Sequence, residues 1–220
     1  MLCAYGFRPL AHIVVVALAP LRVPPPAVVL LAAGTGIGAA VELGRGHLVA
    51  AALLVQLKTV LDNADGQLAR LTGRTSAFGR YLDSECDLLV NAALFAALGS
   101  PWALPGFVLL TLILSTNFNL ERLSRGAAAG WDSSLLGRLY GVLYGWQDRL
   151  ADRLLAEGSI QPWQVTALAN CGMSTQLAAF GLVTALGHPL AFVWVLAAEA
   201  VAIVTLLSVH PKQEVSLEHR

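Results

Sequence analysis

Residues 62–87 read DNADGQLARLTGRTSAFGRYLDSECD, and the spacing of the acidic residues in this stretch decides the fold. Asp62 and Asp65 are three residues apart, and Asp83 and Asp87 are four residues apart. On an α-helix, residues at either spacing lie on one face. The connection between the two acidic pairs is short, so we expect two antiparallel neighbouring helices whose acidic faces meet.

The composition of the whole chain is typical of a membrane protein. Its 220 residues are 56% hydrophobic and 13% charged, with 14 basic and 14 acidic residues, and the mean hydropathy is +0.66. A soluble domain of this length needs more charged surface, and the apolar residues here come in long runs. The net charge of zero gives no sign of a nucleic-acid partner, and we expect none.

The long apolar runs predict where the chain crosses the membrane, since a crossing helix needs about 20 apolar residues. Six candidate spans lie at about 24–43, 47–66, 80–99, 102–121, 163–186 and 189–209. Residues 1–23 are predicted to form a juxtamembrane helix, and residues 122–160 a cytoplasmic amphipathic segment at the interface. The predicted fold class is an all-α integral membrane protein, with a single membrane domain over residues 1–220.

The positions of the basic residues orient these spans. With the N-terminus in the cytoplasm, Arg45 is the only basic residue outside, Lys58 lies within the second span, and all the others are cytoplasmic. Cytoplasmic loops of membrane proteins carry an excess of Lys and Arg. We therefore expect a multi-pass protein of the cell membrane, with both termini and the acidic site on the cytoplasmic side.

The four aspartates require cations. Each Asp placed in a membrane costs about 3 kcal/mol, so four uncompensated ones would cost about 12 kcal/mol. Like charges held close together also repel until protons or cations are bound. Oxygen ligands without His or Cys favour Mg²⁺ or Mn²⁺ over zinc. Four carboxylates can hold two such ions, an arrangement suited to in-line phosphoryl displacement.

Small and basic residues accompany the acids. Gly66 and Ala69 lie on or beside the face of the first acidic pair and leave room for a ligand to approach the backbone. Arg70 lies two turns beyond the first acid, within reach of a diphosphate that bridges from the metals. Gly79 opens the third span opposite them. Together with the acids, these residues predict a site for a metal-bound diphosphate.

This stretch resembles the signature of the CDP-alcohol phosphotransferase family. The matching positions are Asp62-x2-Asp65-Gly66-x2-Ala69-Arg70-x8-Gly79-x3-Asp83-x3-Asp87. They are eight fixed residues over 26 positions, about an eighth of the chain. The six spans, the N-terminal interfacial helix and the cytoplasmic site also resemble that family's architecture, and the family suggests a homodimer.

The resemblance implies an enzyme of phospholipid biosynthesis. Such an enzyme transfers a phosphatidyl-type group from a CDP-linked lipid, here CDP-diacylglycerol, to an acceptor alcohol and releases CMP. By matching position, the metal ligands would be Asp62, Asp65, Asp83 and Asp87. Asp87 would also be the base for the acceptor hydroxyl. The CDP moiety would be bound by Asp65, Gly66, Ala69, Arg70 and Gly79.

The sequence leaves the acceptor open. Basic residues flanking the site favour a polyol phosphate such as glycerol phosphate or inositol phosphate, although inositol, serine and choline-type alcohols also fit. Two other functions compete with the transferase. A divalent-cation transporter would explain the acids but not Gly66, Ala69, Arg70 and Gly79. A non-catalytic membrane scaffold is disfavoured by the intact signature.

Several other residues have two interpretations each. Lys58 either neutralises a neighbouring acid or extends its amine toward the interface. Glu199, an acid inside the sixth span, is either functional or paired at a helix or dimer interface. Gly34, Gly36 and Gly38 are predicted to serve helix packing. The arginines that either bind an acceptor phosphate or contact lipid headgroups are Arg122, Arg125, Arg138, Arg149 and Arg153.

Overall fold

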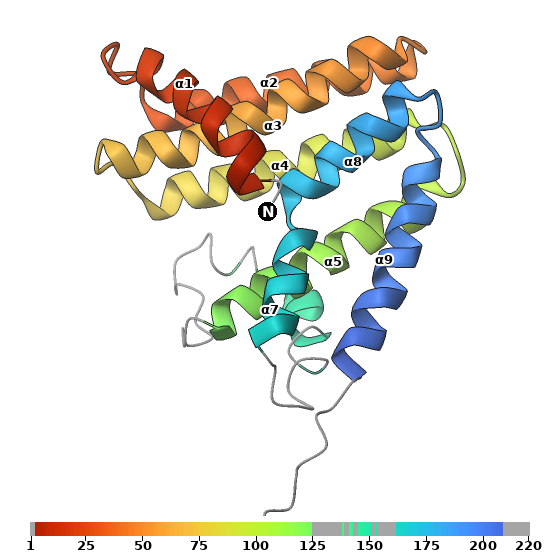
Figure 1. The fold of residues 1–220 in the computed structure, drawn as a ribbon. Helices are drawn as coiled ribbons and strands as arrows, with labels where there is room; N and C mark the ends of the chain where they lie inside the picture. The colour runs from red at the N-terminus through yellow and green to blue at the C-terminus, as the bar shows by residue number, and fades with distance from the viewer. Residues whose placement is uncertain are drawn as a thin grey trace, which may run out of the picture.

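The computed structural model describes residues 3–124, 138, 141–142, 145–150, 153 and 162–208, and in this part of the chain it is all-helical, with no strands. Figure 1 shows the arrangement. The N-terminal elements are a short π-helix η1 (Cys3–Phe7), α1 (Arg8–Leu18), α2 (Pro25–Gly44), α3 (Leu48–Leu71) and α4 (Ala77–Ala97). The others are α5 (Ala103–Ser124), α7 (Pro162–Leu168), the 3₁₀ turn η2 (Ala169–Cys171), α8 (Met173–Ala185) and α9 (Ala191–Ser208).

The turn between α3 and α4 is defined by residues that stop one helix and start the next. Gly73 adopts a positive φ of 65°, and the Arg74 amide donates to the Ala69 carbonyl at 2.9 Å. This is a Schellman ending, which favours glycine because of the left-handed backbone. Ser76 then caps α4, its hydroxyl accepting a hydrogen bond from the Gly79 amide at 3.0 Å. Both acidic helices are therefore fixed at the end nearest the acids.

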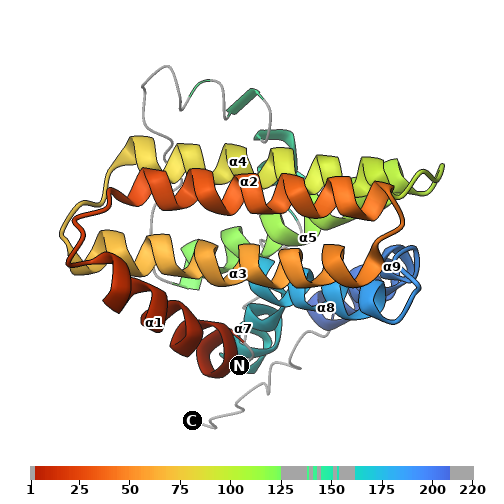
Figure 2. The ribbon, with the colours of Figure 1, turned by 90° about the horizontal axis from the view of Figure 1, so that it is seen from above.

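Helix α2 covers both acidic helices. It packs along α3 and along α4, and Figure 2 shows the three helices running antiparallel in succession. The closest approach is at Gly36, where an added Cβ would lie 2.5 Å from Val90 Cγ1 of α4 and 3.3 Å from Lys58 Cγ of α3. A Cβ on Gly34 would meet nothing within 4 Å, and one on Gly38 would only touch Leu54. Of the three glycines, Gly36 is the one that close helix packing requires.

The acidic helices themselves differ from the prediction in one respect. They are antiparallel, as expected, but their backbones approach each other very little, and α2 joins them instead. The reason is side-chain size, since Lys58 and the acids occupy the space between α3 and α4. The acidic faces therefore meet through side chains and not through close helix packing.

The second half of the described chain packs around aromatic residues. Phe95 of α4 lies 6.0 Å from Phe107 of α5 and 6.1 Å from Phe192 of α9, measured between ring centroids. Phe180 of α8 stacks on Phe95 and lies 5.2 Å from Phe192. These rings form the centre of the larger hydrophobic core, which ties α5, α8 and α9 to the end of α4 away from the acids.

Three of the described helices are long and apolar enough to cross a membrane: α2, residues 103–120 of α5, and α9. The all-α fold class is therefore confirmed for the described residues, whereas the count of six spans is not confirmed. Helices α3 and α4 match the predicted second and third spans in position, but their charged residues interrupt the apolar run. These include Lys58, Asp62 and Asp65 in α3 and Arg80, Asp83, Glu85 and Asp87 in α4.

The predicted fifth span, 163–186, is wrong as a single helix. The structure divides it into α7, η2 and α8, with the break at Gly172, whose backbone is extended at φ −76° and ψ 168°. The apolar sequence predicted one helix because nothing in it is charged. Because the helix is broken at Gly172, the first amides of α8 have no carbonyl in a preceding turn to donate to. The Thr175 and Gln176 amides donate to the Gly172 carbonyl instead.

The two flanking segments are described unequally. Of the predicted juxtamembrane helix, η1 and α1 are described, and α1 packs on α3 through a small core in which Ala11 and Val15 meet Ala64 and Leu68. Most of the predicted amphipathic segment 122–160 lies outside the described residues. Within residues 145–150, Gln147 Oε1 accepts a hydrogen bond from the Ser115 hydroxyl of α5 at 2.9 Å, so this portion packs against α5.

Candidate active site

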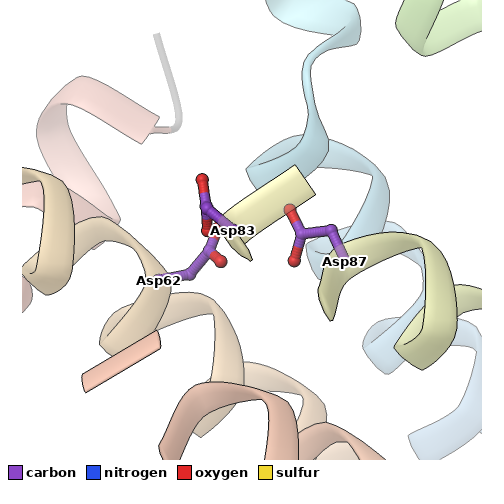
Figure 3. A group of neighbouring side chains, drawn as sticks. All are labelled: Asp62, Asp83 and Asp87. Atoms are coloured by element: carbon purple, nitrogen blue, oxygen red, sulfur yellow. The ribbon is translucent and has the colours of Figure 1, made fainter. Parts of the chain in front are cut away.

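Three carboxylates from the two acidic helices converge on one point. Asp62 of α3 and Asp83 and Asp87 of α4 each offer an oxygen, and these atoms lie within 4.8 Å of one another. Figure 3 shows the three side chains pointing toward a common space, one from one helix and two from the other. The i,i+4 spacing of Asp83 and Asp87 puts both on the face that turns toward α3. The facing arrangement predicted from spacing is thus found for these three acids.

Lys58 lies at the centre of this cluster. Its amine donates to Asp62 Oδ1 at 3.0 Å and also to Asp87 Oδ1, so it joins the two helices by ion pairs. Only 2% of the residue is exposed. Of its two predicted interpretations, neutralisation of the acids is the one that the structure bears out.

Asp65 is the signature acid whose oxygens do not join the convergence of the other three. It is buried, with 6% exposed. Its Oδ2 is buried without a hydrogen-bond partner among the described residues. An unpaired buried carboxylate oxygen is costly, and a bound cation is the partner that would satisfy it.

Arg70 and Gly66 lie against each other on α3. A Cβ built on Gly66 would be 3.4 Å from one guanidinium nitrogen of Arg70, so the arginine folds back along the helix toward the acids. Arg70 is exposed, and within the described part of the chain it forms no ion pair. Its guanidinium is therefore available to an anionic ligand on this part of α3.

The two remaining signature residues are placed by the turn. Ala69 provides the carbonyl that closes the α3 ending. Gly79 lies in the first turn of α4, and a Cβ there would be 3.2 Å from the Ser76 hydroxyl that caps the helix. Gly79 therefore has a structural reason to be small in addition to the predicted role in binding CDP, whereas the hydrogen bond of the Ala69 carbonyl does not depend on the side chain at that position.

The sequence interpretation missed two polar contacts beside the acids. The Asn63 amide of α3 donates to the Ser174 hydroxyl at 3.0 Å, and the Asn91 amide of α4 contacts Met173 Sδ at 3.7 Å. Both contacts reach the first turn of α8, next to the break at Gly172. A signal was present, because Asn91 continues the i,i+4 row of Asp83 and Asp87.

Glu199 is paired within the chain. The Gln176 amide of α8 donates to both of its carboxylate oxygens, at 2.9 and 2.8 Å. Gln176 is buried and also contacts the Cys171 carbonyl at 3.3 Å. The helix-pairing interpretation of Glu199 therefore holds, and the pair fixes α9 against the broken fifth span.

The five arginines of the predicted amphipathic segment are placed only in part. Arg138, Arg149 and Arg153 are exposed, and no described ion pair joins them to the acids. The side chain of Arg122 and all of Arg125 lie outside the described residues. Their predicted role in binding an acceptor phosphate remains a prediction.

The donor set fits a hard divalent cation. All the converging groups are carboxylates, drawn from two helices that the turn holds in register, and the orphaned Oδ2 of Asp65 adds an oxygen nearby that lacks a partner. Oxygen-only sites of this kind suit Mg²⁺ or Mn²⁺.

Comparison with known proteins shows which family the chain resembles. Residues 10–139 match the CDP-alcohol phosphatidyltransferase family. The chain is 34% identical over 153 residues to a phosphatidylinositol phosphate synthase from Corynebacterium glutamicum, covering 63% of this chain and 69% of that protein. It is 44% identical over 50 residues to an archaetidylinositol phosphate synthase from Aeropyrum pernix, covering 23% of this chain and 26% of that protein.

Among solved structures, the chain is similar to the phosphatidylinositol phosphate synthase of Mycobacterium tuberculosis in complex with manganese and citrate. The TM-score is 0.44 and the sequence identity is 23%, over 84% of this chain and 88% of that one. A second structure of that protein, with CDP-DAG bound, gives a TM-score of 0.43 at 23% identity, over 86% and 94% of the two chains.

The chain belongs to the CDP-alcohol phosphatidyltransferase family, because the match spans more than half of its length and contains the whole acidic signature. It is accordingly a membrane enzyme of phospholipid synthesis, a CDP-alcohol phosphotransferase.

Proposed function

We propose that the enzyme transfers the phosphatidyl group of CDP-diacylglycerol to a hydroxyl of a polyol phosphate of the inositol phosphate kind. The observation that carries the donor half is the convergence of Asp62, Asp83 and Asp87, and the guanidinium of Arg70, which folds back over Gly66 on the helix of Asp62, supports it. The relatives named above are synthases of inositol phosphate lipids, and they support the acceptor half.

The four aspartates would hold two Mg²⁺ or Mn²⁺ ions. Asp62, Asp83 and Asp87 share one point, and Asp65 offers its unpaired oxygen. Ions bound there would neutralise the diphosphate of the donor and stabilise the charge that develops on its oxygens. Gly66, Ala69, Arg70 and Gly79, with Asp65, would bind the CDP moiety.

The bond changes assign Asp87 its role. The acceptor oxygen attacks the phosphorus that carries diacylglycerol, a new P–O bond forms, and the P–O bond to CMP breaks. The hydroxyl proton must leave as attack proceeds, and Asp87 would accept it, as a positioned carboxylate can.

Replacing Arg70 by alanine should mainly weaken binding of the donor. A charge-assisted contact to the diphosphate contributes about 1.5 kcal/mol or more, so the apparent KM for CDP-diacylglycerol should rise about tenfold with a smaller change in kcat. Initial rates of CMP release at varied donor concentration measure this. Arg74→Ala removes an exposed arginine of the following turn and should leave the KM unchanged. An unaltered KM in Arg70→Ala would show that Arg70 points elsewhere.

The acceptor is tested by a panel of alcohols. Purified enzyme with CDP-diacylglycerol and Mn²⁺ or Mg²⁺ should release CMP fastest with inositol phosphate, more slowly with glycerol phosphate, and at least tenfold more slowly with inositol, serine or choline. The expected lipid product carries one phosphomonoester, which mass spectrometry detects. A faster reaction with an unphosphorylated alcohol would contradict the proposed acceptor.

The orientation in the membrane completes the proposal. The excess of basic residues on one side supports an orientation with both termini and the site in the cytoplasm, where a soluble polyol phosphate would reach the site. A homodimer is proposed on the family resemblance.

A further inference from the structure

We propose that Lys58 is a tethered cation, which occupies the acidic site in the absence of divalent ions and which those ions must displace. The inference deepens the proposed function, since it rests on the metal-binding role of the aspartates. It assigns a positioning and regulating role to a residue outside the eight-residue signature.

The first support is that the lysine is built into the site. Lys58 lies one helical turn before Asp62, and α2 covers its stem at Gly36, where a Cβ would already be 3.3 Å from Lys58 Cγ. With 2% of its surface exposed, the residue is not a surface lysine that bends inward. Its position is set by the packing of α2 on α3.

The second support is that the lysine and a divalent ion need the same groups. The amine donates to Asp62 and Asp87, which are two of the three acids whose oxygens lie within 4.8 Å of one another. An ion held by these acids would therefore lie a few ångströms from the ammonium group. Two cations this close repel strongly in a poorly hydrated site.

The third support is that the lysine compensates the charge of the acidic cluster. Without it, Asp62, Asp83 and Asp87 would face one another with no cation among the described residues to hold them. With it, α3 and α4 are joined across a space that their backbones do not bridge. The lysine thus holds the acids in register. Because an ammonium on a flexible stem can rotate away, the lysine can give up its place to the ion.

Competition between Lys58 and a divalent ion for the same acids predicts how removing the ammonium changes metal affinity. Removing the ammonium raises the free energy of the metal-free protein, because the acids repel, and lowers that of the metal-bound protein, because a nearby positive charge is gone. Both changes tighten metal binding. Lys58→Met, which keeps the length of the stem, and Lys58→Gln, which keeps a polar end, should each bind Mn²⁺ at least tenfold more tightly than the wild type.

The experiment measures Mn²⁺ binding without donor lipid, by electron paramagnetic resonance of free Mn²⁺ over protein in lipid nanodiscs. Melting temperatures are recorded with and without Mn²⁺. The matched control is Gln56→Met, because Gln56 lies two residues away on α3 and donates to the Leu177 carbonyl of α8 at 3.1 Å, away from the acids. It should bind Mn²⁺ as the wild type does.

The expected result is tighter Mn²⁺ binding in both Lys58 variants, with a lowered melting temperature that saturating Mn²⁺ restores. Equal or weaker binding would overturn the role of Lys58 as a competitor and leave the metal site itself standing. If neither the wild type nor the variants bind Mn²⁺, the metal role in the proposed function is overturned together with this inference. Should Lys58→Met fail to fold without metal, Lys58→Gln purified in Mn²⁺ gives the same comparison.

Discussion

Asp87→Asn should abolish CMP release while the protein stays folded. Asparagine has nearly the same shape as aspartate but binds a divalent ion weakly and does not take the proton of an acceptor hydroxyl. Loss of general base catalysis alone costs about 100-fold or more in rate, and loss of a metal ligand adds to it. Lys58 keeps its pairing with Asp62 in this variant, so the fold should persist.

The rate of CMP release and the melting temperature of the purified protein measure the two parts of this prediction. Asp83→Asn should behave alike, since Asp83 offers an oxygen to the same point. Glu85→Gln is the matched control, because it neutralises an acid of the same helix turn that does not belong to the cluster. Release at the wild-type rate from both aspartate variants would remove the basis for the metal assignment.

Gly36→Ala is the second change with a large expected effect. The new methyl group would lie 2.5 and 2.9 Å from the two γ-carbons of Val90, closer than carbon atoms pack. Valine is branched and cannot turn aside easily, so α2 must shift away from α4. Overpacking of this kind costs about 1 to 3 kcal/mol. We expect a melting temperature lowered by several degrees and a reduced rate of CMP release, because α2 also covers Lys58.

Two further variants separate this packing effect from a general effect of replacing glycine. Gly34→Ala places its methyl group where nothing lies within 4 Å and should be neutral. Val90→Ala in the Gly36→Ala background removes the two carbons that collide and should recover most of the lost stability, which a double-mutant cycle quantifies. Gly36→Ala at wild-type stability, or no recovery in the double variant, would count against the close crossing at this point.

The convergence of three of the acids could be predicted from the sequence because it depends on local spacing. Helical periodicity alone puts Asp83 and Asp87 on one face, and the short turn brings that face opposite Asp62. The turn itself was readable in outline, since Gly73 and Ser76 are residues that end and begin helices. These features follow from neighbours in the chain.

What could not be predicted depends on contacts between distant segments. Lys58 had two interpretations because a lysine near an interface can extend toward water or pair with an acid. The packing of α2 over the Lys58 side chain at Gly36 excludes it from water, and its amine pairs with Asp62. Asp65 lies three residues from Asp62, about 60° around the helix, so spacing did not fix whether its carboxylate would join the others. In the structure its carboxylate is outside the group of three converging acids, and its Oδ2 is buried without a hydrogen-bond partner among the described residues.

The broken fifth span shows another limit of the sequence. An apolar run predicts burial but does not predict whether the helix is unbroken, because a glycine such as Gly172 is tolerated inside membrane helices as well as at breaks. The contacts of Asn63 and Asn91 with the start of α8 accompany the break, and neither is encoded locally. Likewise, hydropathy placed α3 and α4 among the spans. Their charged residues exclude them from the three helices, among those the structure describes, that are long and apolar enough to cross.

Metal-dependent release of CMP from CDP-diacylglycerol tests the central claim most directly. The purified wild-type enzyme, supplied with the donor and the mixed panel of acceptor alcohols, should release CMP with Mn²⁺ or Mg²⁺, stop when the metals are chelated, and resume when they are restored. No CMP with any acceptor at any metal concentration, together with Mn²⁺ flux into liposomes that carry the protein, would contradict the transferase assignment and make the aspartates part of an ion path.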